Sequence, residues 1–212
     1  MYYNSEDIEN LDKAFRANLI NCLSGFKPAH LIGTADKLGH SNLAIFTNIV
    51  HIGANPSLIG FVQRPVSNDS HTYKNIKSTG VFTINHVHKS FVENAHYTSA
   101  RFAKGISEFT HCQLTEEFIG DFKAPFVLES KIKFGLQFVQ EVPIKINNSI
   151  LVIGQIEHIT VDDKALLPDG ILDLSVIKDI CTSGLTNYYT ATKLSQYPHA
   201  KSDKLPNFKS EK

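Results

Sequence analysis

The sequence predicts a mainly β fold with helices at its periphery, and three features lead to this prediction. Two apolar runs lie on either side of an Asn55-Pro56 turn signal. A segment of two helical turns, 71–76, with Gly80 as its stop signal, then leads into another apolar run at 81–85. Finally, the runs 131–139 and 150–161 flank an asparagine turn and resemble a long antiparallel hairpin. A hairpin of this length suits the closure of a β-barrel.

The chain is expected to begin with an amphipathic helix that ends near Leu23. Asn4 or Ser5 can cap it, and acidic residues in the first turn have the favourable sign for a helix N-terminus. Gly25 follows as a stop signal. A lone apolar stripe must cover either its own barrel or a partner subunit. The residues that recur at helical spacing are Ile8, Leu11, Phe15 and Leu19.

The central segment, 41–86, is predicted to contain most of the strands that matter for function. A first strand at 31–35 precedes it. The β-branched residues Ile45, Ile49 and Ile52 then indicate a strand that runs to the Asn55-Pro56 turn. The next strand, 58–62, stops at Arg64-Pro65. A polar loop at 66–70 connects it to the helix, which Gly80 ends.

The second half of the chain is predicted to complete one domain. We expect a short helix at 91–97, a polar and basic junction at 96–101 and a loop at 104–109. After the long hairpin, a last strand at 172–177 and a loop at 184–189 follow. No repeat or linker divides the chain, so residues 1–195 are predicted to form a single domain. Residues 196–212 are rich in Lys, Pro, Ser and Asp and are predicted to form a mobile tail.

Composition excludes several classes of protein. The chain has 212 residues, of which 42% are hydrophobic, so it can bury a sizeable core. Lys plus Arg equals Asp plus Glu at 21 each, so no global basic field attracts nucleic acid. No apolar run approaches the roughly 20 residues of a membrane span, and the N-terminus does not resemble a secretory signal. Three dispersed cysteines without a CxxC pair favour reduced thiols and a cytoplasmic location.

Common catalytic and nucleotide-binding motifs are absent from the sequence. Without GxGxxG the chain has no Rossmann-type nicotinamide or FAD site, although NAD(P)H can still act as a transient substrate. His86 and His88, with His96 and His111 following, could hold a divalent ion, but no supporting carboxylate is evident from the spacing. We therefore assign no metal site. Cys112 follows His111, but neighbouring strand residues face opposite ways, so no catalytic residue is assigned either.

Polar residues at the strand ends and at the helix start suggest a phosphate site. Hydroxyls, amides, a guanidinium and a helix N-terminus can bind phosphate without a glycine-rich loop. A flat apolar strand beside them could carry an aromatic ring system. Alternatively, these residues are the polar rims of an ordinary sheet. The residues are Thr47, Asn48, Arg64, Thr72 and Asn75.

The strand pair SNLAxFTNIxHIGANPxLIGFxxRP and the following HTYKNIKxTGxFTIN resemble the flavin reductase-like FMN-binding proteins of split-barrel fold. The resemblance covers residues 31–189. It implies a Greek-key split β-barrel of about six or seven strands with peripheral helices, working as a homodimer. Its most specific positions are Asn55-Pro56, Arg64-Pro65, Thr72-x-x-Asn75-Ile76 and Phe82-x-x-Asn85.

The resemblance also implies a set of cofactor-binding residues. Phe46, Thr47, Asn48 and Ile49 would form the wall for the flavin ring, although smaller serine-rich runs are usual in the family at this place. Arg64, Thr72 and Asn75 would hold the phosphate. Asn85 belongs to the matching motif. His96 and Ser99 would lie near the cofactor or the dimer interface, and they would serve equally well as helix-cap residues.

The function implied is that of an FMN-binding oxidoreductase. Bound FMN would accept hydride from NADH or NADPH and pass electrons to a flavin, oxygen, a metal chelate or another protein. Two alternatives stay open at this point. One is a flavin-binding electron carrier without NAD(P)H activity. The other is an enzyme of related fold with a different phosphate-bearing cofactor, as in the pyridoxamine phosphate oxidase relatives.

Overall fold

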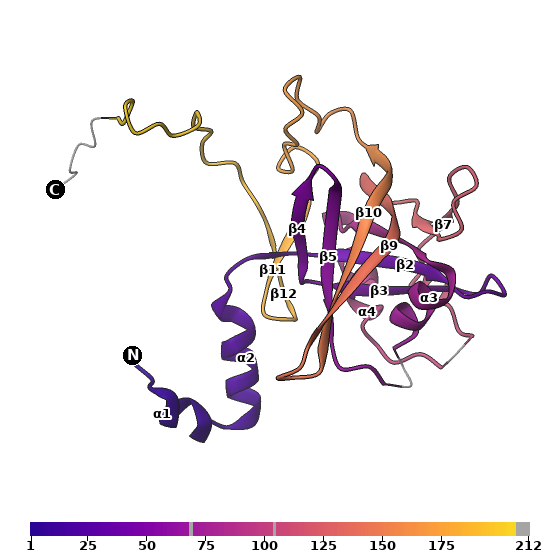
Figure 1. Ribbon diagram of the computed structural model, residues 1–212, viewed down its shortest axis with the longest axis horizontal. Coiled ribbons are helices and arrows are strands. Elements are labelled where there is room, and N and C mark those ends of the chain that lie inside the picture. The colour runs from indigo at the N-terminus through magenta and orange to yellow at the C-terminus, as the bar shows by residue number, and fades with distance from the viewer. Residues whose placement is uncertain (68–69, 104, 207–212) are drawn as a thin grey trace.

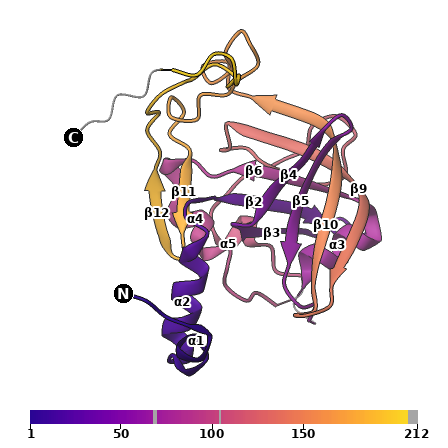
Figure 2. The ribbon, with the colours of Figure 1, turned by 60° about the vertical axis from the view of Figure 1, so that its left-hand side comes forward.

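The computed structural model describes residues 1–67, 70–103 and 105–206. Parts of the predicted loops at 66–70 and 104–109, and of the tail, therefore lie outside the described residues. The described chain is built around a seven-stranded antiparallel sheet that curls into a barrel (Figures 1 and 2). In spatial order its strands are β3 (Ser41–Phe46), β2 (His30–Ala35), β6 (Val81–His86), β9 (Ile132–Ile144), β10 (Ser149–Val161), β5 (Ser57–Gln63) and β4 (Ile49–Ala54).

The barrel has one core inside it and a second core on the outer face of β2 and β3. Successive strand residues point to opposite faces, so Leu31 belongs to the outer core and Ile32 to the inner one. The two layers fix the sheet in register, because a slip of one residue would exchange the faces. The inner core consists of Ile32, Phe61, Ile76, Phe82, Ile84, Phe134, Leu136 and Val152.

Helix α3 (His71–Thr79) contributes Ile76 to the inner core and ends at Gly80. Gly80 has a φ of 79°, in the left-handed region that favours glycine, and its N–H donates to the Ile76 carbonyl. Gly33 is needed for a different reason. A Cβ on this residue would lie 2.2 Å from the carbonyl oxygen of Pro125, so the close approach of these two segments permits only glycine.

Several sequence predictions are confirmed. The first strand, the long hairpin β9–β10 and helix α3 all occur where expected. The helix predicted at 91–97 is a short 3₁₀ helix, η1 (Lys89–Phe91), followed by α4 (Val92–Tyr97). The turn at Asn55-Pro56 joins β4 to β5. Between α4 and β9 lie three smaller elements, α5 (Glu108–His111), β7 (Glu116–Glu117) and β8 (Phe126–Val127).

The prediction of a single N-terminal helix was wrong, because the segment forms two helices, α1 (Ser5–Asn10) and α2 (Lys13–Leu23). Asn4 caps the first in a capping box. Asp12 interrupts the segment, since its carboxylate accepts hydrogen bonds from the N–H groups of Ala14 and Phe15, both at 3.0 Å. An aspartate bonded in this way starts a new helix.

Two strand predictions also need correction. The strand through Ile45, Ile49 and Ile52 is divided at Thr47-Asn48, so that β3 and β4 form opposite edges of the sheet. The described residues 172–177 form turns and one isolated bridge to Leu166 instead of a strand. The last strands are β11 (Ile180–Ser183) and β12 (Asn187–Thr190), which pair with β1 (Lys27–Pro28) in a separate sheet.

The last described residues lie outside the barrel. Residues 196–206 are exposed and form neither helix nor strand, and the predicted mobility of the tail stays a prediction. No helix within the described ranges is long and apolar enough to cross a membrane.

Candidate functional site

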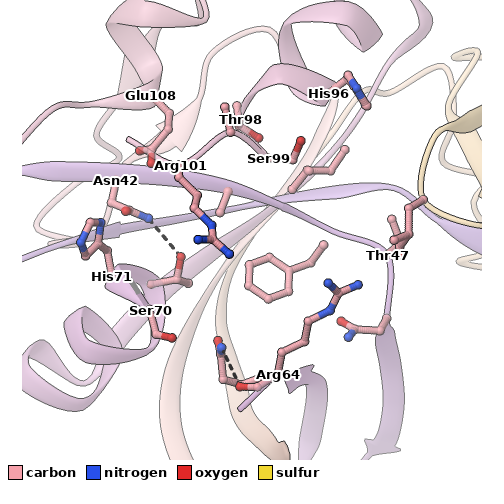
Figure 3. A pocket seen from close by; sticks show the side chains of 18 of the residues that line it. Asn42, Thr47, Arg64, Ser70, His71, His96, Thr98, Ser99, Arg101 and Glu108 are labelled. Carbon is pink, nitrogen blue, oxygen red and sulfur yellow. Dashed lines mark hydrogen bonds between the residues drawn. The ribbon is translucent and has the colours of Figure 1, made fainter. Parts of the chain in front are cut away.

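A pocket of about 640 Å³ opens between the two edges of the sheet (Figure 3). The junction of β3 and β4 and the end of β5 form its base. The start of α3, the segment after α4 and the turn between β11 and β12 form its walls. Chain segments distant in sequence therefore meet at one place. The lining includes Asn42, Phe46, Thr47, Asn48, Gln63, Arg64, Ser70, His71, Thr72, His96, Thr98, Ser99, Arg101, Glu108, Thr186 and Tyr188.

The N-terminus of α3 faces the pocket. Ser70 occupies the N-cap position, but its hydroxyl accepts a hydrogen bond from the Ser67 N–H at 2.9 Å instead of capping the helix. Thr72 is buried, and its hydroxyl oxygen accepts from the Asn42 amide at 3.0 Å. That hydroxyl can still donate its hydrogen. The N–H groups of the first helical turn and these hydroxyls together suit an anion.

Two guanidinium groups enter the pocket from opposite sides (Figure 3). Arg101 comes from the segment after α4 and reaches toward the side of Asn42 and Ser70, whereas Arg64 follows β5 and extends toward Thr47. Neither arginine forms an ion pair with another residue in the part of the chain that the structure describes. Two cations with no counterion among the described residues make the pocket attractive to an anionic ligand.

An aromatic and polar wall forms the base of the pocket. The Phe46 ring packs edge-to-face on Phe61, with centroids 4.9 Å apart, and so is supported by the inner core. The Asn48 amide donates to the Val62 carbonyl at 2.7 Å, which ties the β3–β4 junction to β5. A planar ring system could stack on this wall, with backbone groups at its polar edge.

The β11–β12 turn closes one side of the pocket. Tyr188 and the Nδ1 atom of His96 are hydrogen-bonded at 2.8 Å, and the two rings lie edge-to-face. Burial raises the pKa of the Tyr188 phenol, so it stays protonated near neutral pH. Ser99 is exposed at the same side, whereas Thr98 is buried and donates to the Ala95 carbonyl.

Seven of the ten predicted cofactor-binding residues line this pocket, and three do not. Ile49 packs against the inner core. The Asn75 amide donates to the Thr34 hydroxyl at 3.1 Å. Asn85 is fully buried, donates to the Leu31 carbonyl at 3.1 Å and accepts from the Val127 N–H at 2.9 Å. In the described chain Asn75 therefore joins α3 to β2, and Asn85 joins β6 to β2 and β8.

Sequence reasoning missed other residues of the pocket. Arg101 belongs to the basic junction after α4, so its charge was a usable signal. Glu108 gave no such signal. Its side chain is 6% exposed, and Oε2 accepts a hydrogen bond from the Leu43 N–H at 2.9 Å, across 65 positions of the sequence. Burial raises the pKa of the Glu108 carboxyl.

The histidines that suggested a metal site have other partners. His86 contacts Asp179 through Nδ1 at 2.6 Å, and His88 contacts Ser90 at 2.7 Å. Over the ranges that the structure describes, no group of three or more His, Cys, Asp and Glu side chains is arranged to hold a metal ion.

Solved structures resemble this chain over nearly its whole length. A candidate flavin reductase with a split-barrel domain from Shewanella frigidimarina NCIMB 400 is 46% identical, with a TM-score of 0.91, over 94% of this chain and 100% of that one. Component B of nitrilotriacetate monooxygenase from Bacillus cereus is 20% identical, with a TM-score of 0.80, over 93% and 98% of the two chains. Flavoredoxin from Desulfovibrio vulgaris (Miyazaki F) is also 20% identical, with a TM-score of 0.74, over 96% and 100%.

The last two similarities show the fold alone, which is the split barrel. The sequence profile described as "Flavin reductase like domain" matches residues 24–172, which include the whole seven-stranded sheet. The match covers more than half of the chain. The chain therefore belongs to the flavin reductase-like family.

Proposed function

We propose that the protein is a flavin reductase-like oxidoreductase that binds FMN in the pocket described above. The observation that supports this most strongly is the combination, in one cavity, of two guanidinium groups that form no ion pair with a described residue, the N-terminus of α3 and an aromatic wall. Bound FMN supplies hydride acceptance and electron transfer, which protein side chains cannot provide. The protein's own groups then have the tasks of binding, orienting and shielding.

The phosphate would bind at the α3 end of the pocket. Arg101 and Ser70 lie on this side, and the hydroxyl of Thr72 and the first N–H groups of α3 would add hydrogen bonds. Arg64 would contribute the second positive charge. Asn75 would act indirectly, because its bond to Thr34 holds α3 against β2. This assignment adds Arg101 and Ser70 to the phosphate residues expected from the sequence.

The ring would lie against Phe46, Thr47 and Asn48. The support of Phe46 by Phe61 and the tie between Asn48 and Val62 keep this wall rigid. His96 and the exposed Ser99 would border another side of the cavity. An electron donor could approach from that side without displacing the phosphate.

The donor would be NADH or NADPH, binding transiently, and the acceptor a small molecule. The similarity to a candidate flavin reductase at 46% identity favours this reading. A second candidate is a flavin-binding electron carrier, and the fold shared with a flavoredoxin supports it. A different phosphate-bearing cofactor would use the same α3 end but would leave the protein without flavin absorbance.

The protein would work as a homodimer in the cytoplasm. Helices α1 and α2 project from the barrel as an arm, here called the N-terminal arm (residues 1–26), as Figures 1 and 2 show. Neither helix has a buried residue in the described chain. Phe15 is 51% exposed and Leu23 69% exposed, which is more apolar surface than a helix usually leaves in water. A second subunit would cover it. Three free thiols fit a reducing compartment.

Flavin binding can be tested first and flavin reduction second. The purified protein should be yellow, or should quench the fluorescence of added FMN. NADH or NADPH should then bleach the bound flavin without oxygen. Bleaching by dithionite but by neither nicotinamide would support the electron carrier, and a protein that binds no flavin would contradict the proposal.

A further inference from the structure

Glu108 is a buried acidic residue at the end of the pocket where an anion would bind. It begins α5 and lines the cavity together with His71, Arg101 and Asn42 (Figure 3). Nothing in the proposed chemistry requires a carboxylate here. A negative charge close to a phosphate would even weaken binding, since like charges repel strongly where solvent is partly excluded.

Glu108 cannot easily turn away from the pocket. Its Oε2 atom accepts the hydrogen bond of the Leu43 N–H, a group on the outer edge of β3 that has no neighbouring strand on that side. Breaking this bond would leave a buried N–H without a partner. The carboxyl group therefore stays beside the cavity when a ligand enters.

The charged and titratable groups around Glu108 come from four elements. His71 at the start of α3 and His111 on α5 itself both favour its ionised form, whereas burial opposes it more strongly. Arg101 lies on the same side of the pocket as Glu108 and Asn42. Burial and, to a smaller extent, the nearby Glu108 charge raise the pKa of the Cys112 thiol. Glu116 on β7 is connected through Ser107 and Ser41, whose hydroxyls contact its carboxylate.

We propose that Glu108 couples binding of the flavin phosphate to the uptake of a proton. This carboxyl group becomes protonated when FMN binds but not when riboflavin binds. This inference rests on the proposed function. Its physical basis is that a phosphate dianion placed near a fixed carboxylate raises the proton affinity of that carboxylate. The proton comes from solvent. Once it is bound, the carboxyl group can donate a hydrogen bond toward the phosphate or ribityl oxygens.

Calorimetric titration of the full-length protein tests this coupling. FMN and riboflavin are titrated at about pH 8, where a phosphomonoester is already a dianion because its second pKa is about 6. Buffers of different ionisation enthalpy give the number of protons taken up. We expect uptake approaching one proton per FMN and almost none per riboflavin. The affinity for FMN relative to riboflavin should also fall as the pH rises.

Three variants identify the group that takes up the proton. Glu108→Gln keeps a carbonyl oxygen for the Leu43 N–H, and it should remove the uptake and tighten FMN binding roughly three- to tenfold at about pH 8. Glu116→Gln is the matched control, because this neighbouring carboxylate does not line the pocket, and it should keep the uptake. His71→Asn should keep it as well.

The possible results distinguish a failure of the proposed role of Glu108 from a failure of the proposed function. Undiminished uptake in Glu108→Gln, loss of uptake in His71→Asn, or equal uptake for both flavins would each overturn the role of Glu108 while leaving FMN binding intact. If Glu108→Gln does not fold, the affinity ratio of the two flavins in the wild-type and His71→Asn proteins decides, because a ratio independent of pH above neutrality contradicts the proposal. If neither flavin binds, the proposed function fails and this inference fails with it.

Discussion

His96 and Tyr188 are hydrogen-bonded at 2.8 Å, and this contact joins the end of α4 to the β11–β12 hairpin beside the pocket. The hairpin belongs to the small C-terminal sheet, whereas α4 packs on the barrel. One side-chain pair thus connects the two sheets at the mouth of the cavity. Leu185, Thr186 and Tyr188 of this hairpin line the cavity.

Tyr188→Phe should loosen this wall without unfolding the barrel. The loss of one hydrogen bond should lower the free energy of unfolding by about 0.5–1.5 kcal/mol. Bound flavin should dissociate faster, because the hairpin would open more often. Denaturant titration and stopped-flow fluorescence measure the two effects. Tyr189→Phe, on the same strand, is the control, and an equal effect of both substitutions would contradict a specific role for the His96 contact.

Arg64→Ala and Arg101→Ala should weaken FMN much more than riboflavin, which lacks the phosphate. A hydrogen bond to a charged group contributes roughly 1.5–3 kcal/mol, so each substitution should cost about ten- to a hundredfold in FMN affinity. Fluorescence titration of both flavins gives the comparison. The penalty should shrink at high salt because both side chains are exposed. An equal loss for the two flavins would mean that the arginine contacts the ring or supports the fold.

Thr72→Ala should have two effects that can be separated. Removal of a neutral hydroxyl should weaken FMN by less than the arginine substitutions do, because its net contribution is roughly 0.5–1.5 kcal/mol. The buried Asn42 amide would also lose its acceptor, which should lower the free energy of unfolding. Thr72→Ser keeps the hydroxyl and should restore both properties. If the serine variant behaves like the alanine variant, the hydroxyl has neither role.

The sequence predicted the parts of the fold that depend on local patterns. Helix α3 has its glycine stop, the long hairpin has alternating apolar residues, and Phe46 to Asn48 are adjacent in the chain. Prediction from the sequence failed where contacts between residues far apart in the chain determine the structure. At the break at Thr47-Asn48 the Asn48 amide bonds the distant Val62 carbonyl, and Glu108 is held by the Leu43 N–H. Asn85 and Asn75 have the polarity of ligand-binding residues, but only the packed structure shows that their amides join neighbouring segments.

His30 should make the protein sensitive to mild acid. Its imidazole is buried against His86, and burial together with the nearby His86 holds its pKa well below the ordinary value of 6.5. The unfolded chain therefore binds a proton more readily than the folded one. The free energy of unfolding should decrease as the pH falls below about 6.5. His30→Gln should flatten this dependence in urea titrations, and His51→Gln, at an exposed position, is the matched substitution. An identical slope in the His30 variant would exclude this source.

The N-terminal arm should control assembly. Neither of its helices has a buried residue in the described chain, and the arm contacts the β11–β12 hairpin of the small sheet, where Phe26 packs on Tyr189 with ring centroids 4.9 Å apart. Deleting the residues before Gly25 should give a monomer or an aggregate, measured by light scattering coupled to gel filtration. Phe15→Ser with Leu23→Ser should weaken the dimer while leaving the barrel folded, since neither residue contributes to a core. Because the hairpin lines the pocket, the monomer should also bind flavin less tightly. A truncated protein that remains a dimer with an unchanged melting temperature would show that another surface holds the subunits together.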